Sequence, residues 1–256
     1  MDLTGQTVLV TGANRGIGRH VVEALAKRPA HILCGMRDVG NFEPVRTGAA
    51  REIVPVRLDL SSRESIEECL ADLDRRVDVL VNNAGRFAGG LFEEVDVDEY
   101  YELLQVNVAG LVHLTQRLLR PMLERGHGKI VNNASIAGYA HFPGAVVYSA
   151  SKAAVVGFSE ALRRELSESR VSVLQVVTPG VETRMLEQVR SDYDEHVEDT
   201  AKLDGVAPGE WAEKIVGAIE SDDELLNPGG AERLAKLASR GPSGLLDAVL
   251  GRAFDR

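Results

Sequence analysis

Short apolar runs and longer amphipathic stretches alternate along the chain. Runs typical of buried strands lie at residues 7–10, 31–35, 53–58, 77–81, 129–133 and 171–177. Between and after them, apolar positions recur every three or four residues at 16–27, 63–73, 97–124, 147–167 and 208–220, which predicts helices, with a possible break within 97–124. We therefore expect an α/β fold, a doubly wound parallel sheet with ligands at the carboxyl ends of its strands.

Length and composition fit a single domain spanning residues 1–256. The chain has no low-complexity block and no repeat of fixed period. Its formal net charge of −10 argues against a nucleic-acid partner, because a phosphate backbone needs a basic face. Residues 1–5 lack the features of a signal peptide and no run is long enough to span a membrane, so we expect a cytoplasmic protein without a membrane partner.

The cysteines and histidines do not form a metal-binding pattern. Cys34 and Cys69 lie in a predicted strand and a predicted helix without C-x-x-C spacing, as reduced core thiols do. The six histidines are scattered, with no H-x-x-x-H or H-E-x-x-H pair. We predict no metal site.

A glycine-rich turn follows the first predicted strand. That strand leads into Thr11-Gly12-Ala13-Asn14-Arg15-Gly16-Ile17-Gly18, and a helical pattern comes next. Strand, glycine turn and helix open a dinucleotide-binding unit, since glycines let the backbone approach a pyrophosphate and the helix N-terminus attracts it. The spacing is G-x-x-x-G-x-G rather than G-x-G-x-x-G, so a plain glycine turn is the alternative.

Tyr148, Lys152 and Ser135 are candidate catalytic residues. Tyr148 and Lys152 are four residues apart, which places both side chains on one face of the helix predicted there. A nearby cation lowers the pKa of a phenol and would let Tyr148 exchange protons near neutral pH. Ser135 lies thirteen residues before Tyr148, at the end of an apolar strand-like run. A chance Y-x-x-x-K pair in a helix is the alternative.

Taken together, these motifs resemble the short-chain dehydrogenase/reductase family over roughly residues 4–186. The glycine turn, Asn82-Asn83-Ala84-Gly85, the lone Asn107, and Ser135 with Tyr148 and Lys152 follow the family's order and spacing. The resemblance implies a Rossmann-like fold and a homodimer or homotetramer. It also implies that Lys152 holds a nicotinamide ribose and that Asn107 joins a water-linked proton relay. A helix-kink amide is the alternative for Asn107.

Cofactor contacts are expected from the loops that follow five of the strands, together with the catalytic pair. The expected set is Gly12, Asn14, Arg15, Gly16, Ile17, Gly18, Arg37, Asp59, Leu60, Asn83, Ala84, Gly85, Tyr148, Lys152, Pro179, Gly180, Val181 and Thr183. The loop from Pro179 is one residue shorter than the family's common form, so Thr183 could instead cap a helix.

The end of the second strand predicts which dinucleotide binds. Met36 stands where an acid would accept hydrogen bonds from a free ribose hydroxyl, and Arg37 follows it. With Arg15, two guanidinium groups could meet a 2′-phosphate. We therefore favour NADP(H), while Asp38 leaves NAD(H) possible if the strand ends one residue later.

The sequence is least specific about the substrate. Residues expected to line the pocket are mostly apolar, which suggests an uncharged, moderately large ketone or alcohol; they are Phe87, Ile136, His141, Phe142, Met185, Leu186 and Val189. Residues 182–205 are expected to form a lid, with a surface helix as the alternative. Residues 227–256 form an atypical amphipathic segment that would pack on the same subunit, on a partner subunit or, as the minority reading, on a membrane surface.

The leading hypothesis is an NADPH-dependent oxidoreductase that reversibly reduces a ketone or aldehyde to an alcohol. Tyr148 would be its acid/base, and Ser135 would hydrogen-bond the carbonyl. An NAD-dependent alcohol dehydrogenase of the same family and a non-catalytic dinucleotide sensor are the alternatives. A sugar-nucleotide epimerase or dehydratase usually needs a longer C-terminal domain, for which this chain has little room.

Overall fold

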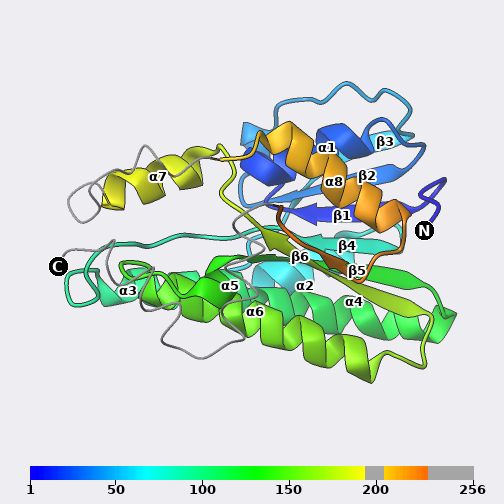
Figure 1. The fold of residues 1–256 in the computed structure, drawn as a ribbon. Coiled ribbons are helices and arrows are strands. Elements are labelled where there is room, and N and C mark those ends of the chain that lie inside the picture. The colour runs from blue at the N-terminus through cyan, green and yellow to red at the C-terminus, as the bar shows by residue number, and fades with distance from the viewer. Residues whose placement is uncertain (194–204, 230–256) are drawn as a thin grey trace.

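Seven parallel strands form one twisted sheet at the centre of the molecule (Figure 1). The computed structural model describes residues 1–193 and 205–229. The order across the sheet is β3-β2-β1-β4-β5-β6-β7. The strands are β1 (Thr7–Thr11), β2 (His31–Met36), β3 (Glu52–Arg57), β4 (Val79–Asn82), β5 (Gly128–Ser135), β6 (Val171–Thr178) and β7 (Leu225–Leu226).

Helices cover both faces of this sheet, so the strands are apolar on both sides. The helices α1 (Gly16–Leu25) and α8 (Pro208–Glu220) lie side by side on one face. The other face carries α2 (Arg63–Asp72), α4 (Leu111–Arg125) and α6 (Val146–Glu165) (Figure 1). A separate apolar core fills each interface, one against α1 and α8 and one against the helices opposite.

The site is positioned by the point at which the strand order reverses, between β1 and β4. From β1 the chain builds outward through β2 and β3, and it then returns to place β4 on the other side of β1. Doubly wound sheets bind ligands in the crevice at the carboxyl ends of the two strands that flank such a switch. The glycine turn after β1 and the Asn82–Gly85 segment after β4 meet there, because a Cβ on Gly12 would lie 2.9 Å from Ala84 Cα.

The predicted fold class and the six predicted strands are confirmed, and the structure adds short elements that the pattern did not predict. The helix expected at 97–124 consists of α3 (Val97–Leu104), a π-helical segment η2 (Gln105–Gly110) and α4, so it does contain a break. The unexpected elements are β7, the 3-10 helix η1 (Val39–Asn41) and α5 (Ala137–Ala140).

Two predicted segments are only partly described. The beginning of the expected lid is a helix, α7 (Arg184–Tyr193). Residues 194–204 of that lid, and residues 230–256 of the C-terminal segment, lie outside the described residues.

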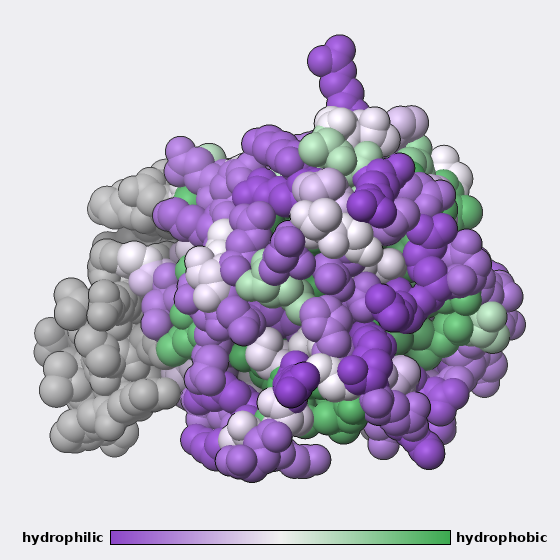
Figure 2. Space-filling model, turned by 90° about the vertical axis from the view of Figure 1, so that its right-hand side faces the viewer, coloured by the Kyte–Doolittle hydropathy of each residue, from purple (hydrophilic) through white to green (hydrophobic). Residues whose placement is uncertain are grey.

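The end of the molecule opposite the site is mainly polar. Figure 2 shows the side on which the N-terminus lies, where hydrophilic residues predominate and apolar ones are scattered among them. In the part of the chain that the structure describes, no helix is both long enough and apolar enough to cross a membrane.

Candidate active site

The backbone of the glycine turn disfavours any side chain at its glycines. Gly12 and Gly16 adopt φ angles of +65° and +53°, which L side chains rarely adopt. A Cβ on Gly18 would lie only 2.2 Å from the Gly12 carbonyl oxygen. The turn therefore brings bare backbone to the beginning of α1.

The N-terminus of α1 is free to bind an anion. Its N-cap residue, Arg15, makes no side-chain capping bond, and the first turn carries no acidic residue. By contrast, Ser62 caps α2 by accepting a hydrogen bond from the Ser65 amide. Uncapped amides beside a glycine turn are the groups that hold a dinucleotide pyrophosphate, so this part of the chain fits such a cofactor.

Asn83 and Ala84 hold β4 against the glycine turn. Their backbone amides both donate to Thr11 Oγ1, at 3.0 and 2.9 Å. The Asn83 side chain donates to the Thr11 carbonyl at 3.0 Å. Both predicted contacts thus lie at the cofactor crevice, and the Asn83 amide fixes the turn.

Ser135, Tyr148 and Lys152 come together at the end of β5. Ser135 is the last residue of β5, and α6 carries the other two one turn apart. Lys152 Nζ lies 5.8 Å from the centroid of the Tyr148 ring and donates to the Asn133 carbonyl at 2.9 Å. Ser135 lies close enough to the Tyr148 hydroxyl to lower its pKa. The structure therefore assembles the predicted trio.

The electrostatics of the trio differ from the expectation. Burial raises the pKa of Tyr148 to about 12, and the hydrogen bond with Ser135 opposes that rise only in part. Burial also lowers the pKa of Lys152 to about 8. The prediction that Lys152 lowers the pKa of Tyr148 below its usual value is wrong for the protein alone, because burial disfavours the charged phenolate. Tyr148 is consequently protonated at neutral pH.

Asn107 lies in the π-helical segment and joins the loop after β4 to helix α6. Its side-chain amide accepts from Arg86 N at 2.8 Å and donates to the Arg86 carbonyl at 2.9 Å. It also donates to Ser151 Oγ at 3.1 Å, and Ser151 donates to the Tyr148 carbonyl at 2.7 Å. Asn107 is thus a kink amide that braces the Tyr148 turn of α6.

Gly85 keeps a space open between Asn107 and Lys152. A Cβ on Gly85 would lie 3.4 Å from Asn107 Oδ1 and 3.8 Å from Lys152 Nζ. Both polar groups therefore face the same point above the end of β4. The water-linked relay stays a prediction.

The groups at the end of β2 favour a phosphate over a free ribose hydroxyl. Arg15 and Arg37 are exposed, and neither forms an ion pair with another described residue. The Asp38 carboxylate caps η1 by accepting from Gly40 N at 2.9 Å and Asn41 Nδ2 at 2.6 Å. The Asp38 carboxylate is thus directed at the 3-10 helix that follows β2.

Asp59 and Leu60 follow β3 as predicted. The Asp59 carboxylate accepts from the Ser61 amide at 2.9 Å and from its hydroxyl at 2.7 Å, which orders the turn before α2. Leu60 is buried, and its carbonyl packs against Gly110 of η2. The contacts of Asp59 and Leu60 with a cofactor stay predictions.

The loop after β6 closes against the glycine turn. A Cβ on Gly16 would lie 3.5 Å from Thr183 Cγ2, so the two loops face each other. Thr183 Oγ1 donates to the Val181 carbonyl at 3.1 Å, and its own carbonyl accepts from Glu187 N at the beginning of α7. Val181 pairs with Val206, and Val206 N donates to the Gly180 carbonyl at 2.8 Å. Pro179 is buried at the base of this loop. The shorter loop still places Thr183 beside the crevice.

Predicted pocket residues form an apolar cluster around Tyr148. Phe87 packs edge to face on the Tyr148 ring with centroids 5.1 Å apart. Phe142, Met185 and Val189 belong to the same cluster. Ile136 is buried directly after Ser135, whereas His141 is exposed at the end of α5 and Leu186 packs toward Gly205. The surface beside the phenol is therefore apolar, as expected.

Three residues of the site were missed from the sequence. Asn133 supplies the carbonyl that binds Lys152, and its side chain is hydrogen-bonded to Asn83 and Thr178. Trp211 of α8 donates to Thr178 at 3.1 Å. A paired Asn132-Asn133 at a predicted buried strand was the available signal, because a buried amide needs partners.

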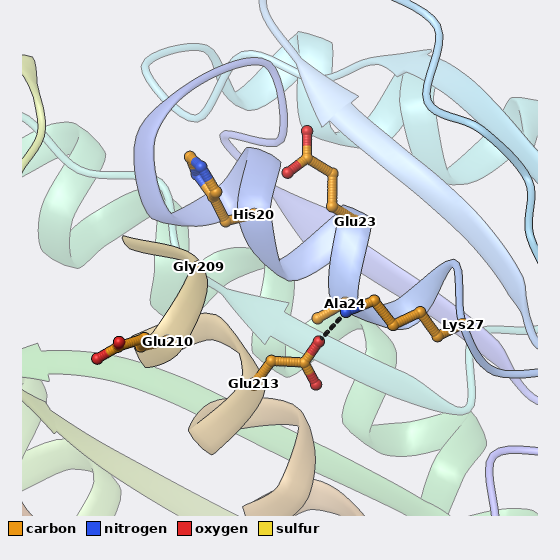
Figure 3. Close-up of a pocket in the computed structure, with 7 residues that line it drawn as sticks. All are labelled: His20, Glu23, Ala24, Lys27, Gly209, Glu210 and Glu213. Carbon is orange, nitrogen blue, oxygen red and sulfur yellow. Dashed lines mark hydrogen bonds and ion pairs between the residues drawn. The ribbon is translucent and has the colours of Figure 1, made fainter. Parts of the chain in front are cut away.

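A second pocket, of about 290 Å³, lies away from this chemistry between α1 and α8 (Figure 3). Its lining contains no residue of the predicted site; the lining residues are His20, Glu23, Ala24, Lys27, Gly209, Glu210 and Glu213. His20 Nδ1 donates to the Gly16 carbonyl at 2.8 Å, and Lys27 pairs with Glu213. Among residues 1–193 and 205–229, no group of three His, Cys, Asp or Glu side chains is arranged to hold a metal ion.

Fold and site define a doubly wound α/β oxidoreductase with a glycine-turn cradle and a Ser-Tyr-Lys trio. The profile described as short chain dehydrogenase matches residues 6–194. The chain is 30% identical over 225 residues to the 3-oxoacyl-(acyl-carrier-protein) reductase FabG of Haemophilus influenzae, covering 86% of this chain and 93% of that protein. This chain belongs to the short-chain dehydrogenase family.

Solved structures agree with that assignment over nearly the whole chain. A short-chain dehydrogenase from Burkholderia cenocepacia in complex with NADP aligns with a TM-score of 0.82 and 26% identity, covering 98% of this chain and 99% of that one. A point variant of the actinorhodin polyketide ketoreductase with NADPH aligns with a TM-score of 0.80 and 31% identity, covering 89% and 97%.

Proposed function

We propose that this chain reduces an uncharged ketone or aldehyde to an alcohol with NADPH. The observation that carries the proposal is the juxtaposition of a partly buried Tyr148 with Ser135, Lys152 and an apolar wall. Two of the similar proteins are described as reductases of carbonyl compounds, which supports the same direction.

In this proposal each residue of the trio has a separate task. Bound NADPH would supply the hydride to the carbonyl carbon. Tyr148 donates its phenolic proton to the carbonyl oxygen, and it carries that proton at neutral pH because its pKa lies well above 7. Ser135 donates a hydrogen bond to the same oxygen and stabilises its developing charge. Lys152, fixed by the Asn133 carbonyl, holds the ribose beside Tyr148.

The preference for NADPH rests on the two exposed arginines. Arg15 and Arg37 offer forked donors to a 2′-phosphate, and Asp38 is engaged in capping η1. The Burkholderia cenocepacia and actinorhodin structures contain NADP and NADPH, which agrees with this choice. The homo-oligomeric state and cytoplasmic location expected from the sequence stay predictions.

The first test is a titration of the purified protein with NADPH and NADH, followed by nicotinamide fluorescence. We expect NADPH to bind at least tenfold more tightly, and Arg37→Ala to remove most of that difference, because a charge-assisted bond contributes about 1.5–3 kcal/mol. Arg120→Ala, on the exposed surface of α4, is the control and should leave the preference intact. A preference for NADH would favour the NAD-dependent dehydrogenase instead.

The second test separates an enzyme from a dinucleotide sensor. Wild-type protein is assayed with NADPH against a panel of ketones and aldehydes, beside Tyr148→Phe. The variant keeps the ring that packs on Phe87 but loses the proton, so turnover should fall at least a thousandfold while NADPH affinity changes little. NADPH binding by a wild-type protein that reduces no member of the panel would support the sensor reading.

A further inference from the structure

A buried chain of hydrogen bonds connects α8 to the glycine turn. Trp211 Nε1 donates to Thr178 Oγ1 at 3.1 Å, and the Thr178 hydroxyl donates to Asn133 Oδ1. Asn133 Nδ2 donates to Asn83 Oδ1 at 3.1 Å, and Asn83 Nδ2 donates to the Thr11 carbonyl at 3.0 Å. The chain therefore crosses the carboxyl ends of four neighbouring strands, from β6 through β5 and β4 to β1.

The direction of these bonds is fixed at both ends. An indole N–H can only donate and a backbone carbonyl can only accept, so Trp211 and Thr11 determine which way each amide between them points. Asn133 and Thr178 are each 8% exposed and Trp211 is 1% exposed. An amide buried this far must satisfy its donors and acceptors, so the network has one favourable arrangement.

The network ends on the groups that hold the cofactor in the proposed function. The backbone carbonyl of Asn133 accepts the Lys152 bond, so the orientation of Asn133 sets the position of Nζ. At the other end, Asn83 Nδ2 lies 3.5 Å from the Gly12 carbonyl. One side-chain network thus reaches both the lysine and the glycine turn.

The two helices at the ends of this network are also fixed to each other. Lys27 and Arg28, which follow directly after α1, pair with Glu213 of α8 at 2.5 and 3.2 Å. Arg28 also pairs with Glu220 at 3.0 Å. Figure 3 shows α1 and α8 side by side with the Lys27–Glu213 pair between them. Trp211 is therefore an anchored donor at the beginning of α8.

We propose that Asn133, Thr178 and Trp211 are positioning residues for the dinucleotide site. They act through Asn83 on the glycine turn and through the Asn133 backbone on Lys152. This inference rests on the proposed NADPH-binding function, because its effect appears as a change in dinucleotide affinity.

The test compares two buried threonines that each accept one side-chain N–H. Thr178→Val removes the hydroxyl from this network. Thr115→Val removes a hydroxyl that accepts from Asn82 Nδ2 at 2.9 Å on the other face of the sheet, away from the cofactor groups. We expect the two variants to lose similar amounts of thermal stability. Only Thr178→Val should also bind NADPH about tenfold more weakly, because the loss of one buried hydrogen bond corresponds to about a tenfold change in affinity. Thr178→Ser keeps the hydroxyl and should restore affinity.

Trp211→Phe gives an independent test if Thr178→Val folds poorly, because it removes the N–H donor and keeps an aromatic, though smaller, ring at this buried position. It should weaken NADPH binding in the same direction. Equal NADPH affinity of wild type, Thr178→Val and Trp211→Phe would overturn the inference and leave the proposed function intact. A wild-type protein that binds neither dinucleotide would instead overturn the proposed function.

Discussion

Lys152 is held where its charge is poorly solvated, and this has a measurable effect on stability. Its pKa falls from 10.5 to about 8 on folding, so between those values the unfolded chain binds more protons than the folded one. The free energy of unfolding contributed by Lys152 therefore rises with pH across this window. Tyr148 has the opposite effect, because its raised pKa makes the free energy of unfolding fall as pH rises, but this begins only above its unfolded pKa of 10.0.

Lys152→Met isolates this effect in urea unfolding measured between pH 7 and 9.5. Wild type should gain stability relative to the variant as pH rises, by a few kcal/mol at most, since one pKa unit corresponds to about 1.4 kcal/mol. The lost bond to Asn133 lowers the variant's stability equally at every pH, so it does not imitate the trend. A difference that stays constant with pH would contradict the low pKa of Lys152.

At the scale of single residues, the sequence predicted which side chains lie close together but not how strongly each one is desolvated. The four-residue spacing of Tyr148 and Lys152 fixes their common face on a helix, whatever lies around it. The pKa of each group depends on burial by segments distant in sequence, such as Phe87, and no local pattern contains that information. Asn133 was missed for the same reason, because its partners come from β4, β6 and α6.

At the scale of elements, the beginning of α1 is expected to be intolerant of any side chain. Gly18→Ala should raise helix propensity but force a Cβ against the Gly12 carbonyl, 2.2 Å away, and Asn83 Nδ2, 2.5 Å away. Overpacking of this kind costs about 1–3 kcal/mol and should also weaken NADPH binding. Gly217→Ala in α8 is the matched control, since nothing lies within 4 Å of its Cβ position, and it should stabilise the protein by up to about 1 kcal/mol. Urea unfolding of both variants tests this, and a Gly18→Ala protein as stable as Gly217→Ala would refute it.

Elements with a sustained period were predictable, whereas short ones were not. The six strands and five helices each carry enough apolar positions to show their period. β7 has two residues and α5 has four, too few for any period to appear. In the π-helical segment Asn107 contacts Arg86 and Ser151, which are distant in sequence, so the sequence indicated only that the long helix could break.

At the scale of the whole molecule, the single domain predicted from length has a direct consequence for unfolding. The sheet is continuous from β3 to β7, and each of its faces has its own apolar core. Because both cores share the same strands, neither has a sheet of its own to fold on. We therefore expect one cooperative thermal transition rather than two.

NADPH should raise the Tm of that single transition. A ligand that binds only the folded state adds about 2.7 kcal/mol at one hundred times its Kd, which corresponds to roughly 5–10 °C in Tm for a domain of this size. Differential scanning calorimetry with and without NADPH measures both the number of transitions and the shift. NADH at the same concentration is the control and should shift Tm less, because it lacks the 2′-phosphate that Arg15 and Arg37 would bind. Two transitions, of which NADPH moves one, would mean that the faces of the sheet unfold separately and would contradict the single domain.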